Sequence, residues 1–137
     1  MTPKIFILIA SSIFLILGSI HLIYTFFTNK FLARDGEATR KMKTTSPILT
    51  KETTVWKAWI GFNASHSLGA IFIGLINILL VTQHFEVYQN SFNILLLDIC
   101  TGIFYLFLSK RYWFKIPLIG ILIATCCFIV AMLLLMN

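Results

Sequence analysis

The sequence predicts an all-α membrane protein, a four-transmembrane-helix bundle whose two termini lie outside the cell. Of its 137 residues, 58% are hydrophobic and only 12% are charged, and a soluble domain of this size could not bury so much apolar surface. Four apolar runs approach or exceed the roughly 20 residues that a membrane-spanning helix needs. Since their connections are short, a single four-helix transmembrane domain over residues 1–137 is expected. The predicted helices cover residues 5–27, 56–81, 92–108 and 116–136.

Positive charge is distributed unevenly between the two ends of these helices. All but one of the eleven Lys and Arg residues lie in or next to the loop of residues 28–55 or the connection between the last two helices, and Lys4 alone lies on the other side. Positively charged loops of multi-pass proteins stay in the cytoplasm. We therefore expect a cytoplasmic loop at 28–55 and an N-out, C-out orientation. The net charge of +6 then reflects topology and contact with anionic lipid, and no nucleic-acid partner is expected.

Polar residues within the predicted helices gather at one depth. His21, Asn63, His66 and Asp98 all fall in a layer roughly 10–16 Å below the predicted cytoplasmic boundary, at a rise of about 1.5 Å per residue. Polar groups in hydrocarbon are costly, usually face the bundle interior and often belong to a site. These four residues are therefore the predicted ligand-binding residues.

Asp98 is the only acidic residue within a predicted span. An aspartate near the centre of a membrane helix costs about 2.5–3.5 kcal/mol on insertion scales, so it needs a partner. His21 and His66 are its natural partners, since a protonated imidazole favours a charged carboxylate beside it. The sequence thus predicts one shared polar centre.

Three functions remain open for this centre. It could bind or pass a small molecule or an ion. It could be purely structural, as in an accessory membrane subunit, because interhelical hydrogen bonds average about 0.6 kcal/mol each. It could also hold a b-type haem between His21 and His66, since neutral imidazoles are iron ligands and Gly18 and Gly69 lie three residues from them. No phosphate-binding loop, nucleophile elbow or H-E-x-x-H motif occurs, so no enzyme reaction is predicted.

A stripe of small residues marks one face of the second predicted helix. Gly61, Ser65 and Gly69 recur every four residues, a spacing that lets helix backbones approach closely in lipid. The stripe could pack within the bundle, or it could join the chain to a second copy or a partner subunit. The lipid bilayer is the other expected partner.

The run WKAWIGFNASHSLGA (residues 56–70), with KETT before it and GSIHLIY in the first helix, resembles a family of small bacterial four-helix integral membrane proteins. Its most specific element is the W-x-x-W-x-G-F-N-x-S-H-S motif from Trp56 to Ser67. The resemblance covers nearly the whole chain. It implies four spans in a bacterial inner membrane, with a histidine near the end of the first, and it implies no activity, ligand or cofactor. A looser similarity to DoxX-like proteins rests on architecture alone.

Overall fold

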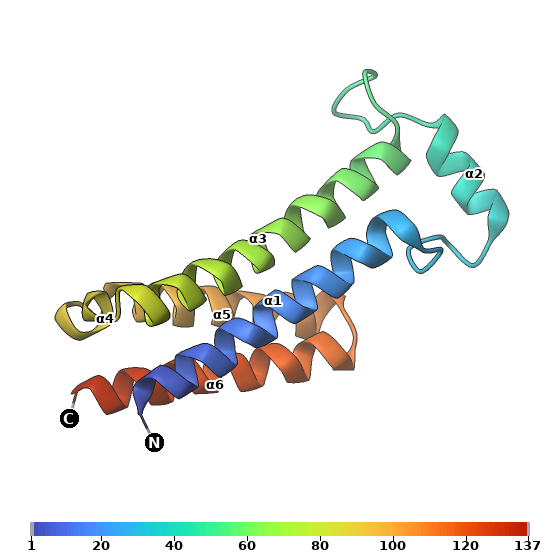
Figure 1. Cartoon of the computed structure of the whole chain (residues 1–137). Helices are drawn as coiled ribbons and strands as arrows, with labels where there is room; N and C mark the ends of the chain where they lie inside the picture. Colours follow the sequence, from blue (N-terminus) through green and yellow to red (C-terminus); the bar gives the residue numbers. More distant parts are fainter. Residues whose placement is uncertain (1, 137) are drawn as a thin grey trace. The chain divides into compact units, whose positions relative to one another are not determined.

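The computed structural model describes residues 2–136 and is all-helical over that range (Figure 1). The helices follow in the order α1 (Pro3–Phe27), α2 (Gly36–Thr44), α3 (Val55–Gln83), α4 (Glu86–Asn90), α5 (Asn93–Tyr112) and α6 (Lys115–Met136). Four of them, α1, α3, α5 and α6, are long and apolar enough to cross a membrane. This confirms the predicted all-α class and the prediction of four candidate membrane-spanning helices.

The observed helices differ from the predicted ones mainly at α5, which continues to Tyr112. Its last turn carries Lys110 and Arg111, and basic side chains are favourable at a helix C-terminus because they face the negative end of the helix dipole. The helix ends where the amide of Trp113 donates to the carbonyl of Ser109 at 3.2 Å. Helices α2 and α4 were not predicted from the sequence.

The contacts divide the chain into two compact units. Unit 1 contains residues up to Leu17 and from Ala70 onward, and unit 2 contains Gly18–Gly69. Helix α3 has 29 residues and α5 has 20, which correspond to lengths of about 43 and 30 Å. Helices α1 and α3 therefore contribute residues to both units, while α5 and α6 belong only to unit 1.

Unit 1 has a close-packed core contributed by all of its helices. The start of α1 supplies Ile7 and Phe14, α5 supplies Leu95 and α6 supplies Phe128, each no more than 2% exposed. Helices α1 and α3 approach each other closely at Gly74, where an added Cβ would lie 2.7 Å from the backbone oxygen of Ser11. Only glycine fits there, because two of the three nearest atoms are backbone and the third is the Cβ of Leu15, so none can move aside without shifting the helix.

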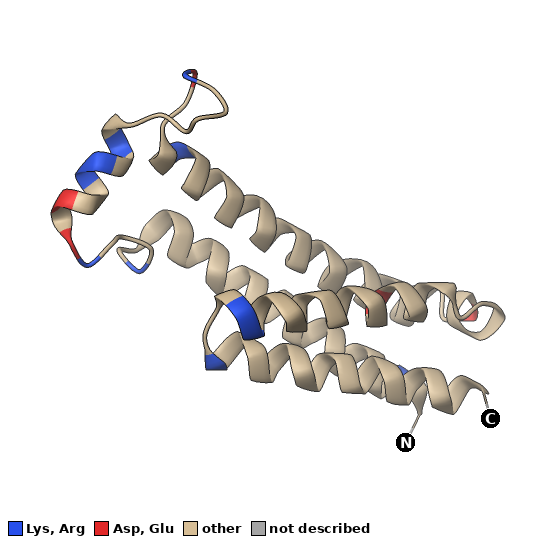
Figure 2. Ribbon diagram, turned by 180° about the vertical axis from the view of Figure 1, so that it is seen from behind, with Lys and Arg blue, Asp and Glu red and all other residues tan. Residues whose placement is uncertain are grey.

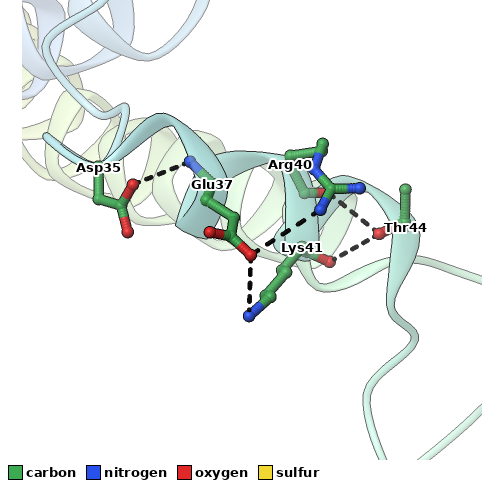
Figure 3. A network of polar contacts seen from close by, with 5 residues as sticks. All are labelled: Asp35, Glu37, Arg40, Lys41 and Thr44. Atoms are coloured by element: carbon green, nitrogen blue, oxygen red, sulfur yellow. Dashed lines mark hydrogen bonds and ion pairs between the residues drawn. The ribbon is translucent and has the colours of Figure 1, made fainter.

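Helix α2 of unit 2 is stabilised by local polar contacts at its two ends (Figure 3). The Asp35 carboxylate caps its N-terminus by accepting from the amide of Glu37 at 2.9 Å, which satisfies a free N–H of the first turn. Glu37 also pairs with Lys41 at 3.3 Å. Both partners are exposed, so this ion pair contributes only about 0.3–0.5 kcal/mol. The helix is thus held locally, by capping and charge placement.

The small-residue stripe does not lie on the buried face of α3. Gly61 and Ser65 are exposed, and an added Cβ at Gly61 would meet nothing within 4 Å. The neighbouring line of residues faces inward: Ser67 is fully buried, and Asn77 is 1% exposed. Gly61 and Ser65 therefore lie on an open face of α3, while Gly69 is partly buried.

Candidate functional site

The first polar cluster lies in unit 2 and joins α1 to α3. His21 Nε2 lies 3.0 Å from Asn63 Oδ1, and the Asn63 Nδ2 group donates to the carbonyl of Trp59 at 2.8 Å. The second bond fixes the orientation of the amide. Because an amide oxygen only accepts, Nε2 of His21 carries the proton, and Nδ1 is the acceptor nitrogen of the neutral ring. Asn63 therefore sets the tautomer of His21.

Neighbouring hydroxyl groups are satisfied along their own helices. Thr25 donates to the carbonyl of His21 at 2.8 Å, and Ser67 donates to the carbonyl of Asn63 at 2.8 Å. Such bonds to a carbonyl four residues earlier let Ser and Thr enter an apolar helix without an unpaired donor. Both hydroxyl groups donate to the backbone of their own helices, so they do not compete for the Asn63 amide or the imidazoles.

His66 completes the cluster. Its ring lies edge-on to His21, with ring centroids 5.4 Å apart and planes inclined by 75°. His66 lies one turn beyond Asn63 on α3, so the helical spacing places both on the side that meets α1. Three of the four predicted ligand-binding residues thus lie together in unit 2.

An open groove lies directly beside this cluster. It has a volume of about 380 Å³ and is lined by Lys30, Phe31, Leu32, Ala33, Met42 and Trp59. Phe31 follows the end of α1 and returns to pack against His21, with ring centroids 4.7 Å apart. Trp59 donates from Nε1 to the carbonyl of Phe31 at 3.3 Å. Two aromatic residues therefore form the wall between the groove and the imidazoles.

Asp98, the fourth predicted residue, belongs to unit 1 and has a different partner. Its Oδ1 accepts from Nδ2 of Asn77 at 3.0 Å, where an imidazole was expected. The reason is its position along α5: it lies fourteen residues before the end of the helix at Tyr112, or about 21 Å. The shorter predicted helix placed Asp98 too close to that end, and so in the layer of the histidines.

Asn77 is the centre of this second cluster. Its amide nitrogen also donates to the carbonyl of Ile73 at 3.0 Å, and its amide oxygen accepts from the hydroxyl of Tyr88. Tyr88 comes from α4 and is fully buried. Asp98 Oδ2 is buried as well and has no hydrogen-bond partner among residues 2–136. The cluster ties α3, α4 and α5 together through one amide.

Burial raises the pKa of the Tyr88 phenol above its ordinary value of 10.0, and the negative charge of Asp98 raises it further. As the pH increases, the unfolded chain therefore loses this proton before the folded chain does. The stability that Tyr88 contributes should be complete below about pH 10 and should fall above it by up to about 1.4 kcal/mol per pH unit. Denaturant titrations above pH 10 should show that the free energy of unfolding of Tyr88→Phe falls less steeply with pH than that of the wild type. The exposed Tyr112→Phe is the control and should keep the full decline; equal slopes in the two variants would contradict the prediction.

The arrangement of the two histidines does not fit a haem held between them. A bis-histidine haem needs the porphyrin plane between the two imidazoles, but the rings of His21 and His66 contact each other edge-on at 5.4 Å. Nε2 of His21 is moreover occupied by Asn63. Among residues 2–136, no three His, Cys, Asp or Glu side chains are grouped to hold a metal ion.

Several residues of the two clusters were not predicted. Asn77 lies on the same helical line as Asn63, so its inward direction was visible in the spacing, but its pairing with Asp98 was not. Trp59 has the position of an interfacial anchor, and Phe31 lies outside any apolar run. Trp59 and Phe31 meet at the groove because the chain folds back after α1, and no local sequence pattern predicts that reversal.

No protein-family model, no curated protein and no solved structure matches this chain. The resemblance to a bacterial four-helix family therefore remains a prediction, and the function is argued from the site alone.

Proposed function

We propose that this protein is a multi-pass protein of the bacterial inner membrane that binds a small acidic amphiphile in the groove of unit 2. His21, Asn63 and His66 lie behind the aromatic wall of this groove and support it, and Lys30 supplies the charge that faces the ligand. One observation carries the proposal: the aromatic wall of the groove is built on the same residues that hold the imidazole cluster. Phe31 packs on His21, and the carbonyl of Trp59 orients Asn63.

The chemistry of the lining favours a ligand with an apolar body and an acidic head. The groove volume of about 380 Å³ falls within the range of small-molecule sites, roughly 300–1,000 Å³. Its walls are mostly apolar and aromatic, and Lys30 supplies the one charged side chain among its lining residues. A lysine attracts a carboxylate or phosphate as a point charge.

The distribution of charge supports the N-out, C-out orientation. In unit 1, Lys110, Arg111 and Lys115 gather where α5 leads into α6, while Lys4 lies near the start of α1 (Figure 2). Lys4 is there held over the ring of Phe85 at 4.5 Å. In unit 2, the connection between α1 and α3 carries most of the remaining positive charge. Both connections are on the cytoplasmic side in the proposed orientation.

A purely structural role would account for the bond between His21 and Asn63, since such interhelical bonds average about 0.6 kcal/mol. It would not account for an open groove beside that bond. A binding role predicts that replacing a tryptophan that lines the groove weakens ligand binding more than replacing one that does not. A structural role predicts no such difference.

Trp59→Leu is expected to weaken binding of decanoate about tenfold, because losing the indole removes apolar contact equivalent to about 1.4 kcal/mol. Trp56→Leu is the matched control, since Trp56 lies one turn away on α3 and does not line the groove. Native mass spectrometry of the detergent-solubilised full chain would give both affinities. Decanol should bind the wild type more weakly than decanoate, and Lys30→Gln should remove that difference. No decanoate binding by the wild type, or equal losses in the two tryptophan variants, would leave the structural role as the better account.

A further inference from the structure

Two neighbouring residues, Ile48 and Leu49, are the most exposed large apolar side chains outside the four long helices among residues 2–136. Ile48 is 108% exposed and Leu49 is 93% exposed, and both lie in the loop between α2 and α3. Exposed apolar residues on α1, α3, α5 and α6 face lipid, which accounts for them. Ile48 and Leu49 need another explanation, because a loop tip of this kind in water leaves apolar surface hydrated.

The loop presents these residues by its own hydrogen bonds. The amide of Val55 donates to the carbonyl of Thr45 at 2.8 Å and closes the base of the loop. The amide of Thr50 donates to the carbonyl of Pro47 at 3.3 Å, which makes a turn with Ile48 and Leu49 at its centre. We call these two residues the apolar tip.

The apolar tip is flanked by positive charge. Lys51 follows it, and the C-terminal part of α2 carries Arg40, Lys41 and Lys43 shortly before it. The loop has a single acidic residue, Glu52. Basic side chains around a small apolar group are the pattern with which peripheral segments bind anionic bilayers, where the charges meet headgroups and the apolar part enters the acyl boundary.

The loop lies close to a membrane boundary. The ammonium group of Lys43 lies 5.3 Å from the centroid of the Trp56 ring, and Trp56 is in the first turn of α3, where tryptophan prefers the headgroup level. Leu49 is six residues before Val55, so the chain between them reaches at most about 20 Å. The apolar tip is therefore within reach of the bilayer that α3 enters.

From these contacts we infer that the apolar tip inserts into the surface of an anionic bilayer, held there by Lys51 and by the basic residues of α2, Lys43 among them. This interaction is separate from the proposed amphiphile site, because neither Ile48 nor Leu49 lines the groove. The binding partner is the anionic lipid headgroup layer. Insertion of the apolar tip would anchor the connection between α1 and α3 to the membrane surface.

Spin labels at two positions of the same loop would test this. Cys100, Cys126 and Cys127 are first replaced by alanine, and Leu49→Cys and Glu52→Cys are labelled in the full chain in nanodiscs. The discs contain phosphatidylcholine alone or with phosphatidylglycerol. With phosphatidylglycerol, the ratio of oxygen to nickel-chelate accessibility should rise severalfold at Leu49. It should stay low at Glu52, the matched control.

Lys43→Gln combined with Lys51→Gln should reverse the change at Leu49 without altering decanoate binding. The inference is overturned if the Leu49 label stays as open to the nickel chelate as the Glu52 label in both lipid mixtures. It is also overturned if the Leu49 label is shielded from both relaxants, since that result would indicate contact with protein. Decanoate binding measured on the same samples separates a failure of this inference from a failure of the proposed function.

Discussion

Gly74→Ala is expected to destabilise the protein by about 1–3 kcal/mol, the usual cost of overpacking a tight contact. The added Cβ would lie 2.7 Å from the Ser11 carbonyl oxygen and 2.8 Å from both the amide nitrogen and Cβ of Leu15. None of these atoms is at the end of a flexible side chain, so the two helices themselves must separate. This cost exceeds the roughly 1 kcal/mol by which alanine favours a helix over glycine.

Gly61→Ala is the matched control on the same helix. Nothing lies within 4 Å of the Cβ it would add, so only helix propensity changes, and stability should rise by up to about 1 kcal/mol. Unfolding of both variants in mixed detergent micelles would give the comparison. The two substitutions should have opposite signs, and a neutral or stabilising Gly74→Ala would contradict the close approach of α1 and α3 in unit 1.

Asn77→Leu is expected to lower stability by about 2–4 kcal/mol, because it leaves two buried polar groups unpaired at about 1–3 kcal/mol each. The groups are the Tyr88 hydroxyl and the Asp98 carboxyl, both of which depend on the Asn77 amide. The exposed Asn93→Leu on α5 should change stability little. The same unfolding measurement serves both variants.

A triple variant distinguishes the cost of unpaired polar groups from the cost of altered packing around Asn77. Combining Asn77→Leu with Asp98→Leu and Tyr88→Phe removes every partner at once, and replacing all members of a buried polar group by apolar side chains can be nearly neutral. Stability should therefore recover substantially. If the triple variant were less stable than Asn77→Leu alone, the cost would lie in packing and not in the unpaired groups.

The spans were predictable because they depend on local composition and length. Any run of about 20 apolar residues can satisfy its backbone in lipid only as a helix or a barrel strand. The end of α5 was missed because Ser109, Lys110 and Arg111 are polar and resemble a loop. In the structure they complete the last turn of the helix, where their charges are favourable.

The two short helices differ in how far the sequence could have revealed them. The capping of α2 by Asp35 and the pairing of Glu37 with Lys41 are local patterns, so α2 could have been predicted. Helix α4 could not, because Tyr88 is held by Asn77, eleven residues away on another helix. A tertiary contact of this kind leaves no periodic signal in the sequence.

The candidate site was predictable where helical spacing decides it. Asn63 and His66 share a face of α3, and His21 lies near the end of α1 that meets them. The partner of Asp98 was not predictable, because it depends on depth, and an error of four residues at a helix end moves a side chain by about 6 Å. The groove depends on Phe31 folding back onto His21, which only the tertiary structure decides.

Photo-crosslinking with a diazirine-bearing medium-chain fatty acid tests the proposed site most directly. The reconstituted full chain would be irradiated and the labelled peptides mapped by mass spectrometry. The proposed site predicts labels concentrated on Phe31, Leu32, Met42 and Trp59, competed by decanoate and reduced in Trp59→Leu. Labels spread over other exposed apolar positions such as Phe72 and Leu97, with no competition by decanoate, would contradict it.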